Sequence, residues 1–175
     1  MEIRISGLGG QGVVLAGQIL GRAAVYSGKN AVQTQSYGAE ARGSAAKSEV
    51  IISDGKIGFP MVRKCDVLIA MNQEAAEKNI SDLKEDGRLI IDNSVAKNIP
   101  ETRAKTFKIP ATQTAETELG EKLYANILML GAFTKITKII DKESMIKAIE
   151  DTFPKKKLEK NIAAFNKGTQ LADAL

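Results

Sequence analysis

The sequence predicts an α/β fold, a Rossmann-like, mostly parallel sheet flanked by helices, with a β-hairpin excursion and a helical C-terminal third. A strand, a glycine-rich turn and an amphipathic helix follow one another over residues 2–28. Short apolar runs then alternate with helical patterns through the middle of the chain, which is typical of parallel α/β sheets. The last third shows only helical periodicity. A chain of 175 residues is expected to form a single domain over residues 1–175.

The first unit is organised by the glycine turn, residues 7–12. Ahead of it, Ile3 and Ile5 alternate with polar residues, which predicts a strand. Behind it, apolar residues recur at helical spacing until Ser27 and Gly28 end the run. Glycines suit this turn because the chain reverses tightly and a Cβ would block close approach of helix, strand or ligand. The residues of interest in the turn are Gly7, Gly9, Gly10, Gln11 and Gly12.

The middle of the chain predicts further strands and helices. A strand over 47–53 is expected to turn at Asp54-Gly55 into residues 56–58, as an antiparallel excursion before Pro60. Cys65 opens a strand buried on both faces and is expected to be a small buried hydrophobe. The other strands are expected at 31–35, 88–92 and 106–109, and helices at 73–83, ending before Gly87, and from 111.

Helices are expected throughout the last third. One covers residues 124–140, a second covers 142–151 with Asp141 as its N-cap and Pro154 closing it, and a terminal amphipathic helix follows. The apolar stretch 126–133 favours core over an interface with another subunit.

Composition excludes several classes of function. The chain has no histidine and one cysteine, so it lacks the commonest general base and cannot form a disulfide or an all-cysteine metal site by itself. The net charge of +4 is mild, and the basic run 155–157 is isolated, so nucleic acid is not expected as a partner. Without a visible signal peptide or membrane span, we expect no membrane association and a cytoplasmic location.

The glycine turn leaves several functions open. Gly7, Gly9 and Gly12 match the dinucleotide fingerprint, but the strand 31–35 lacks the acidic residue that binds the ribose. The first turn of a helix offers unpaired N–H groups and a positive dipole end, which suit an anion or phosphate. The alternative is that the glycines serve only the tight turn.

A second candidate site is the loop of small residues after strand 31–35. Parallel strands end at one sheet edge, so this loop is expected to face the glycine turn. Tyr37 offers a stacking face, Glu40 an acceptor and Arg42 a bidentate donor for phosphate or carboxylate; the alternative is a surface loop with a local Glu40–Arg42 pair. Ser36 and Gly38 complete the candidate binding residues, and no catalytic or metal-ligating residue is expected in this chain.

Polar residues also follow the strands 65–71 and 88–92. Asn72 is placed to cap the next helix, and Asp92, Asn93 and Ser94 lie at the same expected edge. Helix capping is their expected first role, and ligand contact is the alternative.

Together, the glycine turn with Gln11, the loop 35–43 and the segment 125–131 resemble one family. They are similar to the gamma subunit of 2-oxoacid:ferredoxin oxidoreductases, and most of all to that of 2-oxoglutarate synthases. The resemblance runs nearly end to end and includes Asn161, Phe165 and Gly168. The alternatives are the equivalent subunit for pyruvate, branched-chain 2-oxoacids or indolepyruvate, and a stand-alone nucleotide-binding module.

The resemblance implies a complex with alpha, beta and delta subunits that passes electrons to ferredoxin. Thiamine diphosphate and magnesium would lie between the alpha and beta subunits, and the iron–sulfur clusters on the beta and delta subunits. Coenzyme A would be the co-substrate that collects the acyl group, and this chain would bind none of the cofactors alone. The gamma chain would cover the site and help to admit coenzyme A.

Overall fold

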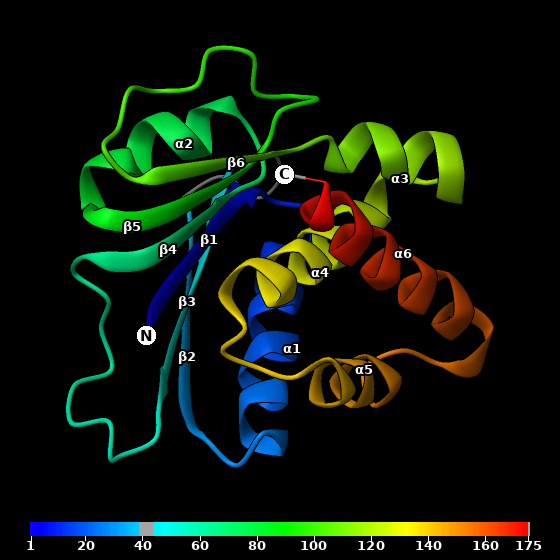
Figure 1. Ribbon diagram of the computed structural model, residues 1–175, viewed down its shortest axis with the longest axis horizontal. Helices are drawn as coiled ribbons and strands as arrows, with labels where there is room; N and C mark the ends of the chain where they lie inside the picture. The colour runs from blue at the N-terminus through cyan, green and yellow to red at the C-terminus, as the bar shows by residue number, and fades with distance from the viewer. Residues whose placement is uncertain (39–43, 175) are drawn as a thin grey trace.

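A computed structural model describes residues 1–38 and 44–174, which form a six-stranded sheet with helices on both faces (Figure 1). The strand order is β2-β3-β1-β4-β5-β6. The strands are β1 (Glu2–Leu8), β2 (Asn30–Tyr37), β3 (Ala45–Ser53), β4 (Cys65–Ala70), β5 (Leu83–Asp92) and β6 (Lys105–Ile109). The helices are α1 (Val13–Tyr26), α2 (Gln73–Asn79), α3 (Ala111–Leu119), α4 (Ala125–Thr137), α5 (Lys142–Glu150) and α6 (Lys155–Asp173). Two short 3-10 helices are η1 (Ile80–Asp82) and η2 (Lys122–Tyr124).

The directions of the strands confirm the predicted fold class. Strands β1, β4, β5 and β6 pair in parallel, whereas β3 pairs antiparallel with both β1 and β2. Only β3 therefore runs against the others. Strand β2 points the same way as β1, so the two end at the same edge, as the topology argument expected, although β3 lies between them.

The predicted hairpin is in the wrong place. The antiparallel hairpin is β2–β3, with Asn30 opposite Ser53 and Tyr37 opposite Ala46. Residues 56–62 form no strand, because Gly58 and Pro60 interrupt the segment and a proline cannot donate to a ladder. The Asp54-Gly55 turn only ends β3, where Asp54 pairs with Lys29 at 2.7 Å.

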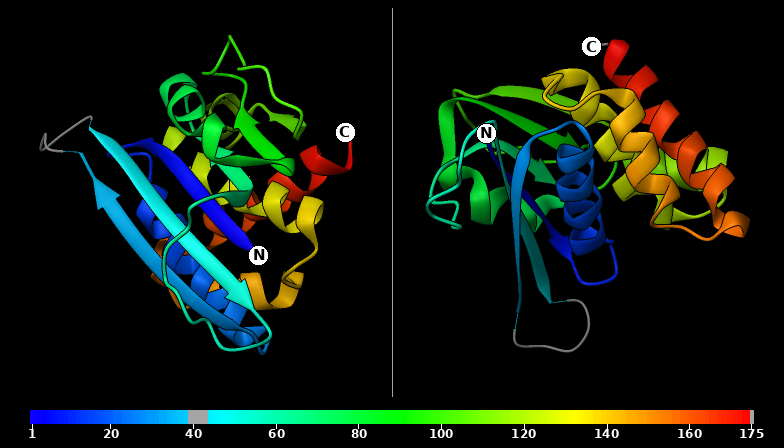
Figure 2. Two further views of the ribbon diagram at one scale, coloured as in Figure 1. Left: turned by 90° about the vertical axis from the view of Figure 1, so that its left-hand side faces the viewer. Right: turned by 90° about the horizontal axis from the view of Figure 1, so that it is seen from below.

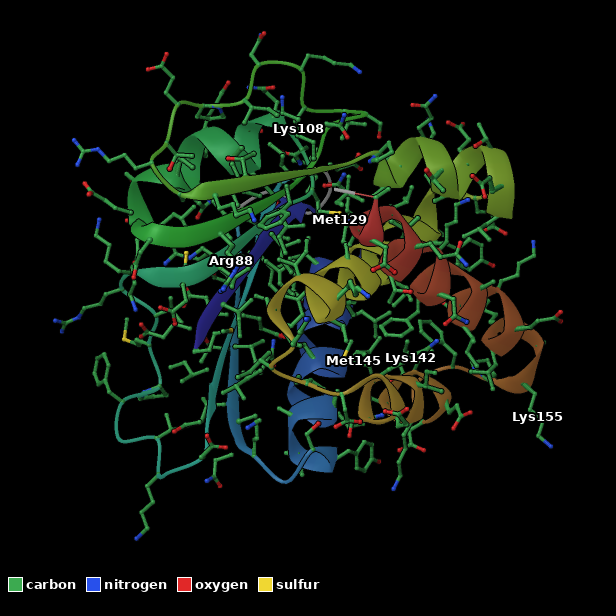
Figure 3. The ribbon with its side chains drawn as sticks, in the orientation of Figure 1. Arg88, Lys108, Met129, Lys142, Met145 and Lys155 are labelled. Carbon is green, nitrogen blue, oxygen red and sulfur yellow. The ribbon has the colours of Figure 1, made fainter. Side chains whose placement is uncertain are left out.

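The sheet separates two apolar cores. On one face, α1, α4, α5 and α6 cover side chains of β1, β3 and β4 (Figures 1 and 2). On the other face, α2 covers β4 and β5 in a smaller cluster that includes fully buried Cys65, as expected for that residue. Side chains crowd between the helical layer and the sheet, whereas Lys155 at the start of α6 projects outward (Figure 3).

Helix α4 is the centre of the larger core. All ten residues from Ala125 to Thr134 are buried, which confirms that the apolar stretch is core. It crosses α6 at Gly131 and Gly168. A Cβ on Gly131 would lie 2.1 Å from the carbonyl oxygen of Phe165, and a Cβ on Gly168 would lie 1.9 Å from that of Leu128. The two backbones therefore touch directly.

Two predicted helix boundaries are wrong. Helix α2 ends at Asn79, and η1 leads directly into β5 at Leu83 instead of a helix through residue 83. Gly87 does not end a helical unit but lies inside β5, where a Cβ would come within 2.9 Å of the Asp66 carbonyl oxygen. The register of β4 and β5 shifts at the same place, so this glycine serves a close approach of two strands.

The helices of the last third follow the prediction with small changes. The long helix begins at Ala125 after η2 and ends at Thr137, because Lys138 adopts a left-handed conformation with φ 55°. Asp141 caps α5 by accepting a bond from the Ser144 N–H at 2.7 Å, as expected. No helix among residues 1–38 and 44–174 has the length and apolar character that a membrane crossing requires.

A buried arginine ties β1 to its neighbours on the α2 face. Arg4 is 3% exposed and bonds Glu49 at 2.8 Å, Asp82 and the Val62 carbonyl at 3.1 Å. Burial works to lower the pKa of its guanidinium, but the bonds to Asp82 and Glu49 outweigh it and raise the pKa. This paired charge is structural, because all of these partners belong to the chain itself, and Glu49 and the Val62 carbonyl hold the guanidinium in the interior while Asp82 is half-exposed.

Candidate functional site at the glycine turn

The turn between β1 and α1 depends on glycine at two positions. Gly10 has φ 97° and Gly12 has φ 72°, a region that side chains with a Cβ rarely adopt. A Cβ on Gly12 would also lie 2.2 Å from Nδ2 of Asn126, whereas one on Gly10 would meet nothing within 4 Å. One glycine is therefore packed against α4, and the other faces open space.

Gln11 fastens the turn to the end of β4. Its Oε1 accepts bonds from the Leu8 N–H at 2.7 Å and from Asn72 Nδ2 at 3.0 Å. Its Nε2 donates to the Met71 carbonyl at 3.1 Å. Both amide atoms are engaged within the chain, so the structure gives Gln11 a positioning role, and direct contact with a ligand stays a prediction.

Asn126 holds the turn from the other side. Its Nδ2 donates to the Gly12 carbonyl at 3.1 Å, and its Oδ1 accepts from the Ile127 N–H at 2.8 Å. We did not assign this role from the sequence. A signal was present, because Asn126 is polar at the head of an otherwise apolar helical run.

The N-terminus of α1 differs from those of α2 and α3. Helix α2 is capped by Asn72, which accepts from the Ala75 N–H at 2.8 Å. Helix α3 is capped from a neighbouring strand, because buried Asp92 accepts from the Thr112 N–H at 2.9 Å. These bonds confirm the capping roles expected of Asn72 and Asp92. Helix α1 has no side-chain cap and no acidic residue in its first turn, so its N–H groups and dipole suit an anion.

Two cavities flank this helix end. One of about 230 Å³ lies between Gly10, Gln11, Met71, Thr112 and Lys122. A second of about 190 Å³ lies between Gly12, Tyr124, Phe153, Lys157 and Asn161. Leu123, 61% exposed, lines both. Each cavity thus combines apolar walls with one lysine, and no sequence pattern singled out Lys122 or Leu123.

The described ends of the predicted binding loop lie beside the turn. The Gly9 N–H donates to the Ser44 carbonyl at 2.8 Å, and the Gly38 N–H donates to the Ala45 carbonyl at 2.8 Å. Ser36 is exposed and Tyr37 is 61% exposed at the end of β2. Glu40 and Arg42 lie outside the described residues. The described ends of the loop therefore lie at the same sheet edge as the turn, while the contacts of these two charged residues stay predictions.

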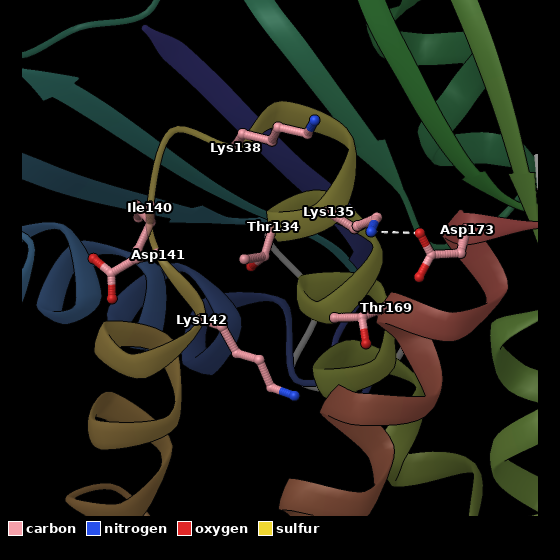
Figure 4. A pocket seen from close by; sticks show the side chains of 8 residues that line it. All are labelled: Thr134, Lys135, Lys138, Ile140, Asp141, Lys142, Thr169 and Asp173. Carbon is pink, nitrogen blue, oxygen red and sulfur yellow. Dashed lines mark ion pairs between the residues drawn. The ribbon is translucent and has the colours of Figure 1, made fainter.

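A third cavity lies elsewhere, between α4, α5 and α6 (Figure 4). It has about 440 Å³ and contains no residue of the predicted site. Lys135 forms an ion pair with Asp173 across it. Lys135 and Lys138 stand at the C-terminal end of α4, where cations stabilise a helix. Lys135 and Lys138 thus have a structural explanation, and the smaller cavities at the glycine turn remain the candidate site.

The described part of the chain offers no group of three side chains that could ligate a metal. Within residues 1–38 and 44–174, no three His, Cys, Asp or Glu side chains group as metal ligands. Burial raises the pKa of the Cys65 thiol to about 11, so the thiolate that a metal requires is disfavoured. An iron–sulfur cluster therefore finds no set of thiolate ligands in the described part of the chain.

Comparison with known proteins identifies relatives over the full length. Residues 2–171 match the family model described as pyruvate ferredoxin/flavodoxin oxidoreductase. The 2-oxoglutarate synthase subunit KorC of Methanocaldococcus jannaschii is 52% identical, over 99% of this chain and 95% of the relative. The gamma subunit of a keto/oxoacid ferredoxin oxidoreductase from Geobacter sulfurreducens superposes with a TM-score of 0.89 at 44% identity, covering 99% of each chain.

A longer relative has the same fold as one of its parts. The 2-oxoglutarate:ferredoxin oxidoreductase of Magnetococcus marinus, whose structure has 2-oxoglutarate, coenzyme A and succinyl-CoA bound, superposes with a TM-score of 0.91 at 28% identity. The match covers all of this chain and 31% of that one. The same fold thus also occurs as one part of a longer polypeptide.

Proposed function

This chain belongs to the pyruvate ferredoxin/flavodoxin oxidoreductase family, and on that premise we propose its role within the complex. It is the gamma-type subunit of a 2-oxoacid:ferredoxin oxidoreductase. The observation that carries this conclusion is 52% identity to a 2-oxoglutarate synthase subunit over 99% of the chain. We propose 2-oxoglutarate as the oxoacid, with pyruvate and branched-chain 2-oxoacids as the alternatives that purified complex would distinguish.

We propose that the reactive groups belong to partner subunits. Thiamine diphosphate and iron–sulfur clusters bound by alpha, beta and delta subunits would supply the decarboxylation and carry electrons to ferredoxin. This chain has no histidine, and its one cysteine is buried, so its own contribution is binding and orientation. The complex as a whole would convert the 2-oxoacid to its acyl-CoA.

The contribution we propose for this chain is a seat for the phosphates of coenzyme A. The uncapped first turn of α1 supplies N–H donors and a positive dipole end. Lys122 adds a charge beside Gly10. Its ion pair with Glu116, at 3.4 Å between exposed side chains, is weak enough to exchange for a ligand. The apolar wall around Leu123 would exclude water from the neighbouring acyl-transfer chemistry.

The test is the dependence of the assembled complex on coenzyme A. Lys122→Gln is expected to raise the KM for coenzyme A by roughly 3- to 10-fold, which corresponds to the free energy of about one hydrogen bond. The KM for the 2-oxoacid should not change. Lys142→Gln is the matched control, because Lys142 lines the distant cavity. An unchanged KM for coenzyme A in Lys122→Gln, with the complex intact, would contradict this seat.

The prediction for Arg42 rests on the sequence. A guanidinium in this loop can bind a phosphate bidentately, which contributes about 1.5–3 kcal/mol. Arg42→Ala should therefore weaken coenzyme A by roughly 10- to 150-fold and leave the 2-oxoacid unaffected. If Arg42 instead pairs with Glu40 or another subunit, size-exclusion chromatography would show lost assembly or stability. An intact complex with wild-type dependence on coenzyme A would end the hypothesis.

The partners and the cytoplasmic location are tested by purification from the native cell. We expect a tagged chain in the cytoplasmic fraction, together with alpha, beta and delta subunits that carry thiamine diphosphate and clusters. Recovery as a monomer with bound nucleotide would favour the stand-alone nucleotide-binding module instead.

A further inference from the structure

The two edges of the sheet are protected differently. Strand β6 is five residues long, contains Lys105 and Lys108, and is followed by Pro110. Strand β2 is eight residues long and contains no charged residue and no proline. Its register with β3 is unbroken from Asn30 to Tyr37. Charges, prolines and bulges are the features that keep edge strands from pairing with other chains, and β2 has none of them. It lies at the outer edge of the sheet, next to β3 (Figure 2).

The ladder identifies which backbone groups of β2 are open. The Gly38 N–H donates to the carbonyl of Ala45, opposite it in the same register. Hydrogen-bonded pairs alternate along an antiparallel ladder, so the even-numbered residues of β2 bond to β3. The odd-numbered residues point their N–H and C=O groups away from β3. They are Ala31, Gln33, Gln35 and Tyr37, and no turn, loop or side-chain hydrogen bond within the described residues reaches their backbone groups.

Helix α1 extends this open surface next to β2. The residues Val14, Gln18, Gly21 and Val25 recur at spacings of four, three and four, so they share one helix face. A Cβ on Gly21 would lie 3.8 Å from the Cβ of Gln33, which places this face beside β2. Val25 is 59% exposed. In a chain with 26% charged residues, these four residues of the helix face and the eight residues of β2 carry no charge.

We propose that this surface binds a second copy of the same chain. Two β2 strands would pair antiparallel about a two-fold axis at Thr34. This register forms hydrogen-bonded pairs between Ala31 and Tyr37 of the copy, and between Gln33 and Gln35 of the copy. It therefore uses all four open residues of each strand. The axis stands perpendicular to the sheet, so the two α1 helices lie on the same face and present Gly21 and Val25 to each other.

The composition of β2 favours a second copy over a different subunit. Self-pairing brings each residue against the same short sequence reversed, and any charge would meet a like charge nearby. An uncharged strand avoids this cost at every position. Thr34 meets Thr34 of the copy on the axis, a cross-strand pair that stabilises sheets.

The sharpest test places a cysteine on the axis. In the proposed register, Thr34 and its copy form a non-hydrogen-bonded pair, whose Cα atoms lie about 4.5 Å apart, within reach of a disulfide. Mild oxidation of Thr34→Cys should give a disulfide-linked dimer on a non-reducing gel, in the purified full chain and in the assembled complex. Gln35→Cys is the matched control, because its copy lies too far away. Buried Cys65 does not compete. Cross-linking of neither variant, or of both equally, would overturn the register.

A second pair of variants tests the interface without oxidation. Thr34→Lys places like charges opposite each other and should raise the dimer dissociation constant by roughly 10- to 100-fold, measured by light scattering. Thr34→Val keeps a β-branched side chain and should leave it nearly unchanged. The proposal is overturned if the wild-type chain is monomeric, if the lysine variant still dimerises equally well, or if the lysine variant loses a different subunit instead of a second copy.

Discussion

The crossing of α4 with α6 and the turn before α1 both require glycine, but for different reasons. At the crossing, a Cβ on Gly131 or Gly168 would meet backbone atoms, at 2.1 Å and 1.9 Å, inside the buried layer of helices. In the turn, a Cβ on Gly12 would meet the movable side-chain amide of Asn126, and Gly10 faces open space. The crossing has no room for a ligand, whereas the turn leaves Gly9 and Gly10 exposed ahead of α1.

This difference separates glycines that are required only for packing from glycines that also allow a ligand to approach the backbone. Loss of the first kind should lower stability alone. Loss of the second kind should also change the binding of coenzyme A, if the proposed seat is correct. Variants at the two places, ordered by expected effect, test the distinction.

The largest effect is expected for Gly168→Ala. The new Cβ would overlap the Leu128 carbonyl oxygen, so α6 must move away from α4. We expect a loss of about 3 kcal/mol or more in the free energy of unfolding, since overpacking against backbone cannot relax through a rotamer. Chemical denaturation of the purified chain measures it. In complexes that still assemble, the KM for coenzyme A should be unchanged. A stable Gly168→Ala chain would contradict the direct backbone contact.

A smaller loss of stability is expected for Gly12→Ala. The left-handed backbone costs about 1–2 kcal/mol for a residue with a Cβ, and Asn126 must give up its bond to the Gly12 carbonyl, worth about 1 kcal/mol. Thermal unfolding and steady-state kinetics measure the two consequences. We expect both lower stability and a higher KM for coenzyme A. Lower stability with an unchanged KM for coenzyme A would show that Gly12 is required only for packing.

Gly10→Ala should separate access from packing most clearly. Its Cβ meets no atom of the chain, so only backbone strain remains, about 1–2 kcal/mol. The Cβ would stand at the open side of the turn, and the KM for coenzyme A should rise. Gly28→Ala is the matched control, because Gly28 also has a positive φ of 75° and open surroundings at the other end of α1. Equal kinetics in the two variants would remove the turn from the binding site.

The smallest effect concerns that other end of α1, where Ser27 donates to Asp141 at 2.7 Å. The bonds from Ser27 and Ser144 lower the pKa of the Asp141 carboxyl to about 2 from an ordinary 3.8. The ionised form therefore stabilises the fold above pH 3.8, and this contribution is lost as the pH falls toward 2. Asp141→Asn should flatten the stability profile in that window and leave coenzyme A kinetics unchanged. An identical acid profile would contradict the cap.

Features written in short stretches of sequence were predictable. The glycine turn, the helix that ends at Ser27 and Gly28, and the caps at Asn72 and Asp141 depend on residues within a few positions of each other. Local backbone preferences and side-chain-to-backbone bonds determine them. The sequence also predicted that the turn and the described ends of the loop lie at one sheet edge, because the helix between β1 and β2 makes the two strands run in the same direction.

The partners across longer distances were decided by the tertiary structure. The alternating pattern of residues 47–53 fits a strand but does not say which strand it pairs with, because main-chain hydrogen bonds are the same for every partner. Burial of Val50 and Ile52 beneath α1 stabilises β3 in its position between β2 and β1. The hairpin predicted at Asp54-Gly55 therefore does not form. The role of Asn126 was not predicted for a similar reason: its bond to Gly12 joins residues 114 positions apart, and no local pattern indicates that pairing. Composition excluded a disulfide and an all-cysteine metal site within this chain, whereas only the packing of distant segments decided which residues surround the glycine turn.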